Sequence, residues 1–158
     1  MNIGSYEMNK HKFYYIPRTD MDSMTPGRMI AQATHAAQNF SEYMKVILEK
    51  KSDYPDTTTL IKNYLIWKNE TKYNYGTTIV LKPNTAYDQV EEFNNMQNFF
   101  YNEFKKLVCF TVIDPEYAIK DGSTTHILED ICTGIYFFGT REQMETFGNY
   151  KLFDMEFK

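Results

Sequence analysis

Short apolar runs alternate with longer amphipathic stretches along most of the chain. Apolar runs that end at proline, glycine or asparagine predict four strands, over residues 13–16, 77–81, 108–113 and 134–138. Apolar residues at helical spacing predict helices over residues 26–48, about 60–68, 87–106 and 141–147. In the helix over 87–106, Glu92 is among the residues predicted to point outward. Thr25 and Pro26 suit the N-cap and first position of the first helix. The predicted order is therefore β-α-α-β-α-β-β-α.

This alternation predicts an α/β fold of the three-layer sandwich type, with about four strands in a mostly parallel, mixed sheet and helices on both faces. The continuous β-branched run at 77–81 is typical of a strand buried on both faces. In such folds ligands bind at the carboxyl ends of the strands. We therefore expect a site near residues 18–20, Lys82 and residues 114–116.

The first helix carries a polar stripe. Arg28, Gln32, His35 and Asn39 fall within about 60° on a helical wheel. Arg28 lies in the first turn, where free N–H groups favour an anion, so one hypothesis is a phosphate or carboxylate site with His35 deeper in it. The alternative is an ordinary solvated face. The opposite side, predicted to pack on the sheet, holds Ile30, Ala33, Ala37, Phe40 and Met44.

Asp114 directly follows the third apolar run and is the strongest candidate for a catalytic carboxylate. It can equally cap a turn, because Asp-Pro is common turn chemistry. His35 can likewise be a buried histidine whose hydrogen bonds are made within the protein. The chain has no G-x-S-x-G, P-loop, H-E-x-x-H or C-x-x-C motif, so no motif supports a nucleophilic serine, nucleotide hydrolysis or zinc chemistry. We expect no metal and no cofactor.

Length and charge limit the number of domains and the partners that the sequence predicts. The 158 residues and 18.8 kDa predict one domain over residues 13–158, with residues 1–12 as an N-terminal extension. A net charge of −4, from 17 basic and 21 acidic residues, gives no global positive field, so nucleic acid would need a local basic patch. Scattered solubilising lysines are the alternative. The basic candidates are Lys10, Lys12, Arg18, Lys82, Lys105 and Lys106.

Two cysteines, Cys109 and Cys132, are too few for a disulfide framework and fit a reducing compartment. The first eleven residues lack the apolar core of a signal peptide, and no apolar stretch is long enough to span a membrane. These observations predict a cytoplasmic protein with no membrane partner. They leave open whether the chain forms a homodimer.

Several segments resemble one family, the type 2 peptidyl-tRNA hydrolases of archaea and eukaryotes. R-T-D-M at 18–21 and G-R-M-I-A-Q-A-T-H-A-A at 27–37 are similar to the family pattern R-x-D-L … G-K-x-A-A-Q-x-[ST]-H-A-A. V-I-D-P-E at 112–116 is similar to a strand ending in D-A-G, and G-S-T-T at 122–125 to a G-S … T segment. F-G-N-Y-K-L-F at 147–153 is similar to the family ending T-G-x-L-K-L-[YF].

The resemblance implies hydrolysis of the ester that joins a peptide to the terminal ribose of tRNA, with peptidyl-tRNA as partner, no metal and no covalent intermediate. It implies that Asp114 orients or activates water, that Arg28 faces the oxyanion or a phosphate, and that His35 holds the geometry or moves a proton. A threonine hydroxyl, from Thr125 or Thr133, would add a donor. Residues implied to bind substrate are Arg18, Asp20, Gln32, Lys82 and Ser123.

The chain departs from the family pattern at the implied site. Arg28 stands where the family has lysine, and Asp114-Pro115-Glu116 stands where it has D-A-G. Two further hypotheses follow from these departures. One is a tRNA- or protein-binding module that has lost turnover, and the other is a hydrolase with a smaller acyl substrate.

Overall fold

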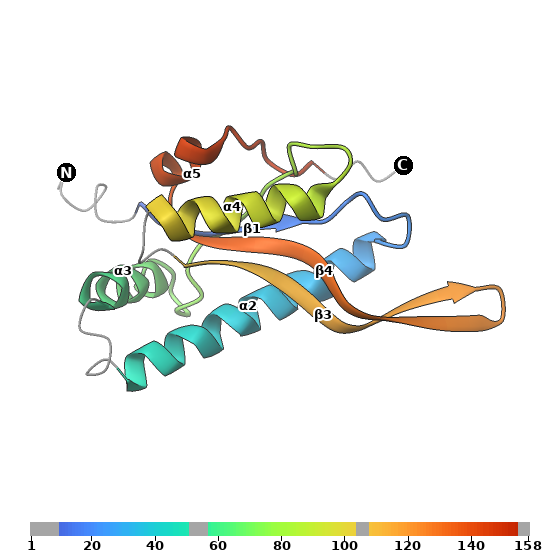
Figure 1. The fold of residues 1–158 in the computed structure, drawn as a ribbon. Coiled ribbons are helices and arrows are strands. Elements are labelled where there is room, and N and C mark those ends of the chain that lie inside the picture. The colour runs from blue at the N-terminus through green and yellow to red at the C-terminus, as the bar shows by residue number, and fades with distance from the viewer. Residues whose placement is uncertain (1–9, 51–56, 104–107, 155–158) are drawn as a thin grey trace.

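A computed structural model describes residues 10–50, 57–103 and 108–154 (Figure 1). The predicted order of elements is confirmed, and residues 104–106 of the predicted third helix lie outside the described part, as do residues 1–9 of the predicted extension. In chain order the elements are β1 (His11–Pro17), α2 (Pro26–Glu49), α3 (Thr58–Asn69), β2 (Thr78–Val80), α4 (Gln89–Glu103), β3 (Val108–Asp121), β4 (Thr124–Thr140) and α5 (Arg141–Phe147).

The four strands form one mixed sheet in the order β2-β1-β4-β3. β1 and β2 are parallel, whereas β4 is antiparallel to both β1 and β3. The prediction of a mostly parallel sheet was therefore wrong. A parallel pairing of β3 with β4 needs a long crossover connection, but only Gly122 and Ser123 separate these strands, so they pair as a hairpin.

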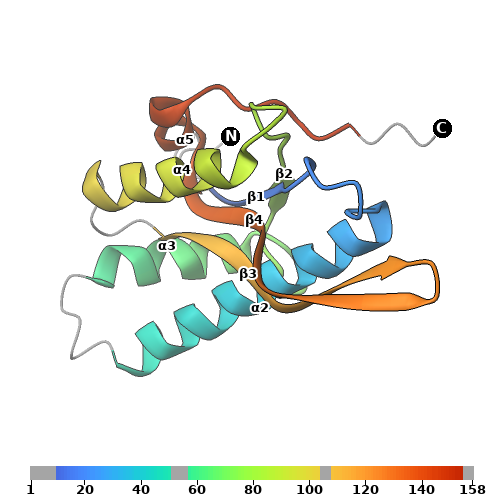
Figure 2. The same ribbon diagram turned by 45° about the vertical axis from the view of Figure 1, so that its right-hand side comes forward.

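β3 and β4 are much longer than predicted. β3 continues past Asp114-Pro115 to Asp121, because it is the outermost strand of the sheet, where a missing N–H breaks no ladder. Gly122, with a φ of +60°, makes the turn that starts β4. Residues 114–131, here named the arm, extend from the sheet as two strands only (Figure 1 and Figure 2). Asp114 is thus within a strand, and the predicted strand end there was wrong.

Both faces of the sheet are covered by helices. Phe13 and Tyr15 of β1 belong to one core with α2 and α3, and the alternate residues Tyr14 and Ile16 belong to a second core with α4 and α5. Figure 2 shows these two pairs of helices on opposite sides of the sheet. Within the described residues, no helix is both long enough and apolar enough to cross a membrane.

Three predictions of burial need correction. β2 is a short edge strand with Thr78 and Val80 exposed, so it is not buried on both faces. Ile30 and Ala37 of α2 are exposed, because the buried row of this helix runs through Gln32, Ala36, Phe40, Met44 and Ile47 instead. Glu92 of α4, predicted to point outward, is buried.

Candidate functional site

The polar stripe of α2 lies against β3 and β4. Gln32 is only 4% exposed, and its Nε2 donates to Asp114 Oδ2 at 2.7 Å. The fully buried Thr133 hydroxyl donates to Gln32 Oε1 at 2.8 Å and lies 3.3 Å from the Val112 carbonyl oxygen. These bonds join a hydroxyl, an amide and a carboxylate in one chain, here named the polar junction. A solvated face therefore does not describe Gln32.

A β-bulge places Thr133 in the polar junction. In the register of β3 and β4, Val112 pairs with Gly134 and Ile113 pairs with Cys132, which leaves Thr133 as the extra residue. A bulge bends its strand and redirects one side chain. The irregularity therefore turns Thr133 toward α2 at the point where the arm leaves the sheet.

Asp114 is half-buried at the root of the arm, and both of its carboxylate oxygens accept hydrogen bonds. Oδ2 accepts from Gln32, and Oδ1 accepts from the backbone N–H of Glu116 at 3.0 Å. The carboxylate is therefore held in one orientation from two sides. A general base needs a fixed orientation toward the water that it activates, and these two bonds provide one.

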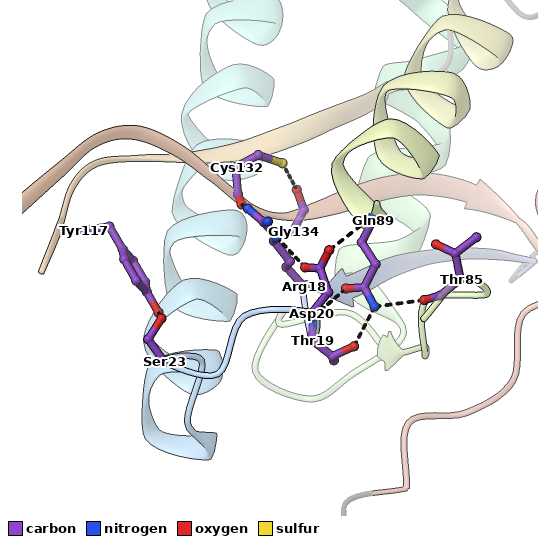
Figure 3. Close-up of polar contacts among 9 residues, drawn as sticks. All are labelled: Arg18, Thr19, Asp20, Ser23, Thr85, Gln89, Tyr117, Cys132 and Gly134. Atoms are coloured by element: carbon purple, nitrogen blue, oxygen red, sulfur yellow. Dashed lines mark hydrogen bonds and ion pairs between the residues drawn. The ribbon is translucent and has the colours of Figure 1, made fainter. Parts of the chain in front are cut away.

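Arg28 lies one turn before Gln32, beside the arm. Its Nη1 donates to the carbonyl oxygen of Ala118, and its guanidinium carbon lies 5.0 Å from the centre of the Tyr117 ring. The Tyr117 hydroxyl in turn lies 3.1 Å from Ser23 Oγ, in the loop before α2 (Figure 3). The cation thus packs on an aromatic face and a carbonyl, which offsets its unfavourable place in the first helical turn.

His35 lies on the other side of the polar junction. It is exposed and lines a hollow of about 280 Å³ together with Asn39, Glu42 and residues 111–113. Neither Arg28 nor Asp114 lines this hollow. One side of α2 thus runs along β3: Arg28 lies beside Ala118, Gln32 beside Asp114, and His35 beside Ile113. Seven residues of helix place Arg28 and His35 about 10 Å apart along the helix axis.

A second polar cluster lies at the carboxyl end of β1. Arg18 donates to Asp20 Oδ1 at 2.6 Å and to the Cys132 carbonyl oxygen at 3.1 Å. Asp20 Oδ2 accepts from the backbone N–H of Gln89, the first residue of α4, at 3.2 Å. Arg18 and Asp20 thus bind each other, and Asp20 also caps α4, where a carboxylate is favourable.

Gln89, which is not among the residues predicted for the site, connects this cluster. Its side chain is buried, accepts from the backbone N–H groups of Thr19 and Asp20, and donates to Thr19 Oγ1 and the Thr85 carbonyl oxygen (Figure 3). The available signal was a polar residue next to the apolar stripe of a helix. Gln89 therefore fixes the loop after β1 to the loop before α4.

The remaining predicted residues are distributed over two places. Lys82 is half-exposed, 4.0 Å from Asp154 Oδ2, and lines a hollow of about 320 Å³ with Thr19, Gln89 and residues 83–86. Ser123 lies in the turn of the arm, and Thr125 pairs with Lys120 near its tip. Six residues along β3 separate Lys120 from Asp114, or about 20 Å. Of the two candidate threonines, Thr133 is the one connected to Asp114, through Gln32.

The two cysteines are buried, and burial raises the pKa of both thiols. They are therefore poorly suited to act as thiolate nucleophiles. In the part of the chain that the structure describes, no group of three or more His, Cys, Asp or Glu side chains could hold a metal ion.

Comparisons with protein-family models, with curated proteins and with solved structures found no match to this chain. The function must therefore be argued from the residues and from the geometry of the polar junction.

Proposed function

We propose that the protein hydrolyses peptidyl-tRNA, cleaving the ester between the peptide and the terminal ribose. The observation that carries the proposal is the polar junction, in which the half-buried Asp114 carboxylate is oriented by the Gln32 amide and the Glu116 backbone N–H. An ester hydrolase without a metal or a covalent intermediate needs a fixed base beside its bound water. Asp114 supplies that base.

The chemistry is a direct attack by water. Asp114 takes a proton as the water oxygen bonds to the ester carbonyl carbon, and the carbon–oxygen bond to the ribose then breaks. The ribose oxygen leaves as a hydroxyl after taking up the proton. Arg28, on the arm side of Asp114, is the cation for a nearby phosphate or for the oxyanion, once it exchanges its bond to the Ala118 carbonyl oxygen for one to substrate.

Thr133 and Gln32 are positioning residues in this proposal. The Thr133 hydroxyl fixes the orientation of the Gln32 amide, and the amide then presents its N–H to Asp114. His35, in the neighbouring hollow, is the group that contacts the peptide or moves a proton. The substrate class itself rests on the resemblance of residues 18–37 and 112–116 to the type 2 peptidyl-tRNA hydrolases.

A binding module without turnover is the second candidate, and one observation favours it. Both oxygens of Asp114 and the guanidinium of Arg28 already have partners within the protein. Substrate would have to displace the contact of Arg28 with Ala118 before Arg28 could act. A protein that only binds tRNA needs no such exchange.

The test is incubation of the purified protein with a peptidyl-tRNA that carries a labelled peptide, followed by measurement of released peptide and free tRNA. We expect release that continues in EDTA, together with no release from a small acyl ester of ribose. Binding of the peptidyl-tRNA without release would establish the binding module instead. Release from the small ester at an equal rate would assign the third hypothesis, a hydrolase of smaller acyl substrates.

A further inference from the structure

The connection between α3 and β2 presents two tyrosine rings to solvent. Tyr73 is 65% exposed and Tyr75 is 75% exposed. Their ring centroids lie 6.0 Å apart at an interplanar angle of 37°. Exposed apolar side chains that are contiguous mark interaction sites, whereas scattered single ones are normal, and these two rings are contiguous.

Hydrogen bonds and packing fix the shape of this aromatic turn, residues 71–76. Thr71 Oγ1 accepts from the backbone N–H groups of Tyr75 and Gly76, at 2.9 and 3.2 Å, and the Thr71 carbonyl oxygen accepts from Asn74 at 3.1 Å. Asn74 has a φ of +58°, in the left-handed region. The two tyrosines are therefore presented by an ordered turn, which reduces the entropy lost on binding.

The turn is also fixed to the core. A Cβ atom at Gly76 would lie 2.1 Å from the Trp67 ring, so only glycine allows this close approach. Trp67 Nε1 donates to the Thr77 carbonyl oxygen at 2.8 Å, next to the turn. The turn that carries the tyrosine pair thus packs on the buried Trp67 indole through Gly76.

The sequence around the two rings is basic. Lys72 Nζ lies 5.4 Å from the centre of the Tyr73 ring, and Lys68 lies over Tyr64 on α3. The one carboxylate in the sequence from 62 to 77 is Glu70, whose side chain is 6% exposed and accepts from Lys12 Nζ at 2.8 Å. The aromatic turn therefore shows two rings and the Lys72 ammonium group to solvent, while the side chain of Glu70, just before the turn, is buried and paired with Lys12.

We propose that the aromatic turn is a stacking platform for single-stranded nucleic acid. Two bases stack on Tyr73 and Tyr75, and Lys72 contacts a phosphate between or beside them. Base–aromatic stacking accepts any base, because every base has a π-face, and a lysine supplies the salt-dependent part of such binding. The turn precedes β2, whereas the polar junction lies at the root of the arm, so this site is separate from the proposed hydrolytic one.

The test is fluorescence anisotropy of the full-length protein with a labelled single-stranded RNA 12-mer and the matching DNA 12-mer. We expect Tyr73→Ala and Tyr75→Ala each to weaken binding about tenfold or more. Tyr87→Ala and Tyr101→Ala are matched controls, since these tyrosines are 82% and 75% exposed at other places, and they should leave affinity unchanged. Circular dichroism checks that all four variants keep the fold.

Lys72→Gln and a series of salt concentrations test the proposed phosphate contact. Removing one phosphate contact should lower the slope of log affinity against log salt by about 0.7. No binding of either 12-mer by the unsubstituted protein would overturn the proposal, and so would equal losses in the control variants. Binding that is indifferent to salt would overturn it too, because an uncharged ligand would then be the occupant. Weaker 12-mer binding by the Tyr73→Ala and Tyr75→Ala variants, with unchanged peptidyl-tRNA turnover, would show that this site is separate from the proposed hydrolytic one.

Discussion

β3 and β4 run through both the body of the sheet and the arm, but the two regions are stabilised differently. In the body, residues 134–138 of β4 are buried between helices on both faces. In the arm, Tyr117 is buried, while Ile127 is 59% exposed. Strand pairing continues without a core because Tyr117, Ala118 and Asp114 are each tied to α2 or the loop before it. The body thus supplies the stability, and the arm supplies the position of Asp114.

The largest expected effect separates the two regions directly. Phe137 is 1% exposed and stacks on Phe100 with ring centroids 4.5 Å apart. Phe137→Ala should lower the free energy of unfolding by about 3–5 kcal/mol, because it leaves a cavity in the second core. Ile127→Ala in the arm should change it by less than about 0.5 kcal/mol. Urea denaturation measures both, and similar losses would mean that the arm shares the core.

The polar junction should show an intermediate effect. Thr133→Val keeps the shape of the side chain but leaves the buried Gln32 Oε1 without its donor. We expect a loss of about 1–3 kcal/mol in urea denaturation. Thr125→Val, at the exposed tip of the arm, is the matched control and should be near neutral. A neutral Thr133→Val would show that the hydroxyl does not fix the amide.

The free energy of unfolding should depend on pH through Glu92 of α4, a helix that covers the body of the sheet. Burial raises the pKa of Glu92, although backbone N–H groups of Asn84 and Thr85 partly oppose this by donating to its Oε1. A raised pKa means that the folded state retains the proton at a higher pH than the unfolded state does. The Glu92 contribution to stability is therefore full below the ordinary glutamate pKa and is lost as pH rises through the folded value.

Glu92→Gln removes this titration while keeping the acceptor for both N–H groups. The free energy of unfolding of the variant minus that of the unsubstituted protein should increase as pH rises from about 4 to about 7. Urea denaturation across that range measures this difference. Asp88→Asn, at an exposed position before α4, is the control and should give no such trend. A constant difference between Glu92→Gln and the unsubstituted protein would contradict the assignment.

The smallest expected effect lies within the arm. Glu116 and Glu129 are exposed and directly opposite in the register of β3 and β4, an unfavourable pair of like charges. Glu129→Lys should stabilise the arm by about 0.2–1 kcal/mol. Amide hydrogen exchange of residues 116–129 should slow while the global unfolding free energy stays almost constant. Unchanged exchange would show that this pair does not limit the arm.

The sequence predicted the body far better than the arm. Apolar periodicity is strong where strands and helices are buried, so all eight elements and their order were predictable. Beyond Ile113 the arm has little apolar patterning, and Asp114-Pro115 is typical of a turn, so β3 was ended eight residues early. The wrong prediction of a mostly parallel sheet followed, because the pattern did not indicate the hairpin turn at Gly122.

For the site, helical spacing predicted that Arg28, Gln32 and His35 share one side of α2, but it assigned the opposite side to the sheet, although Gln32 is buried and Ile30 is exposed. The bond from Gln32 to Asp114 joins residues 82 positions apart, and the bulge that turns Thr133 toward them has no local signal. Arg18 and Asp20 were predicted as substrate residues, yet they bind each other, and Asp20 also binds the first residue of α4. Helix periodicity finds a shared face, whereas hydrogen-bond partners depend on the register between distant strands.

The most direct measurement is peptidyl-tRNA turnover by Asp114→Asn set against its melting temperature. Asparagine keeps one of the two acceptors that Gln32 and Glu116 use, so the melting temperature should fall by about 2–4 °C, which corresponds to about 1 kcal/mol. Turnover should fall about 100-fold or more, because the base is lost. Asp121→Asn, at the exposed end of β3, should change neither quantity. Turnover retained by Asp114→Asn would contradict the assignment of Asp114 as the catalytic base.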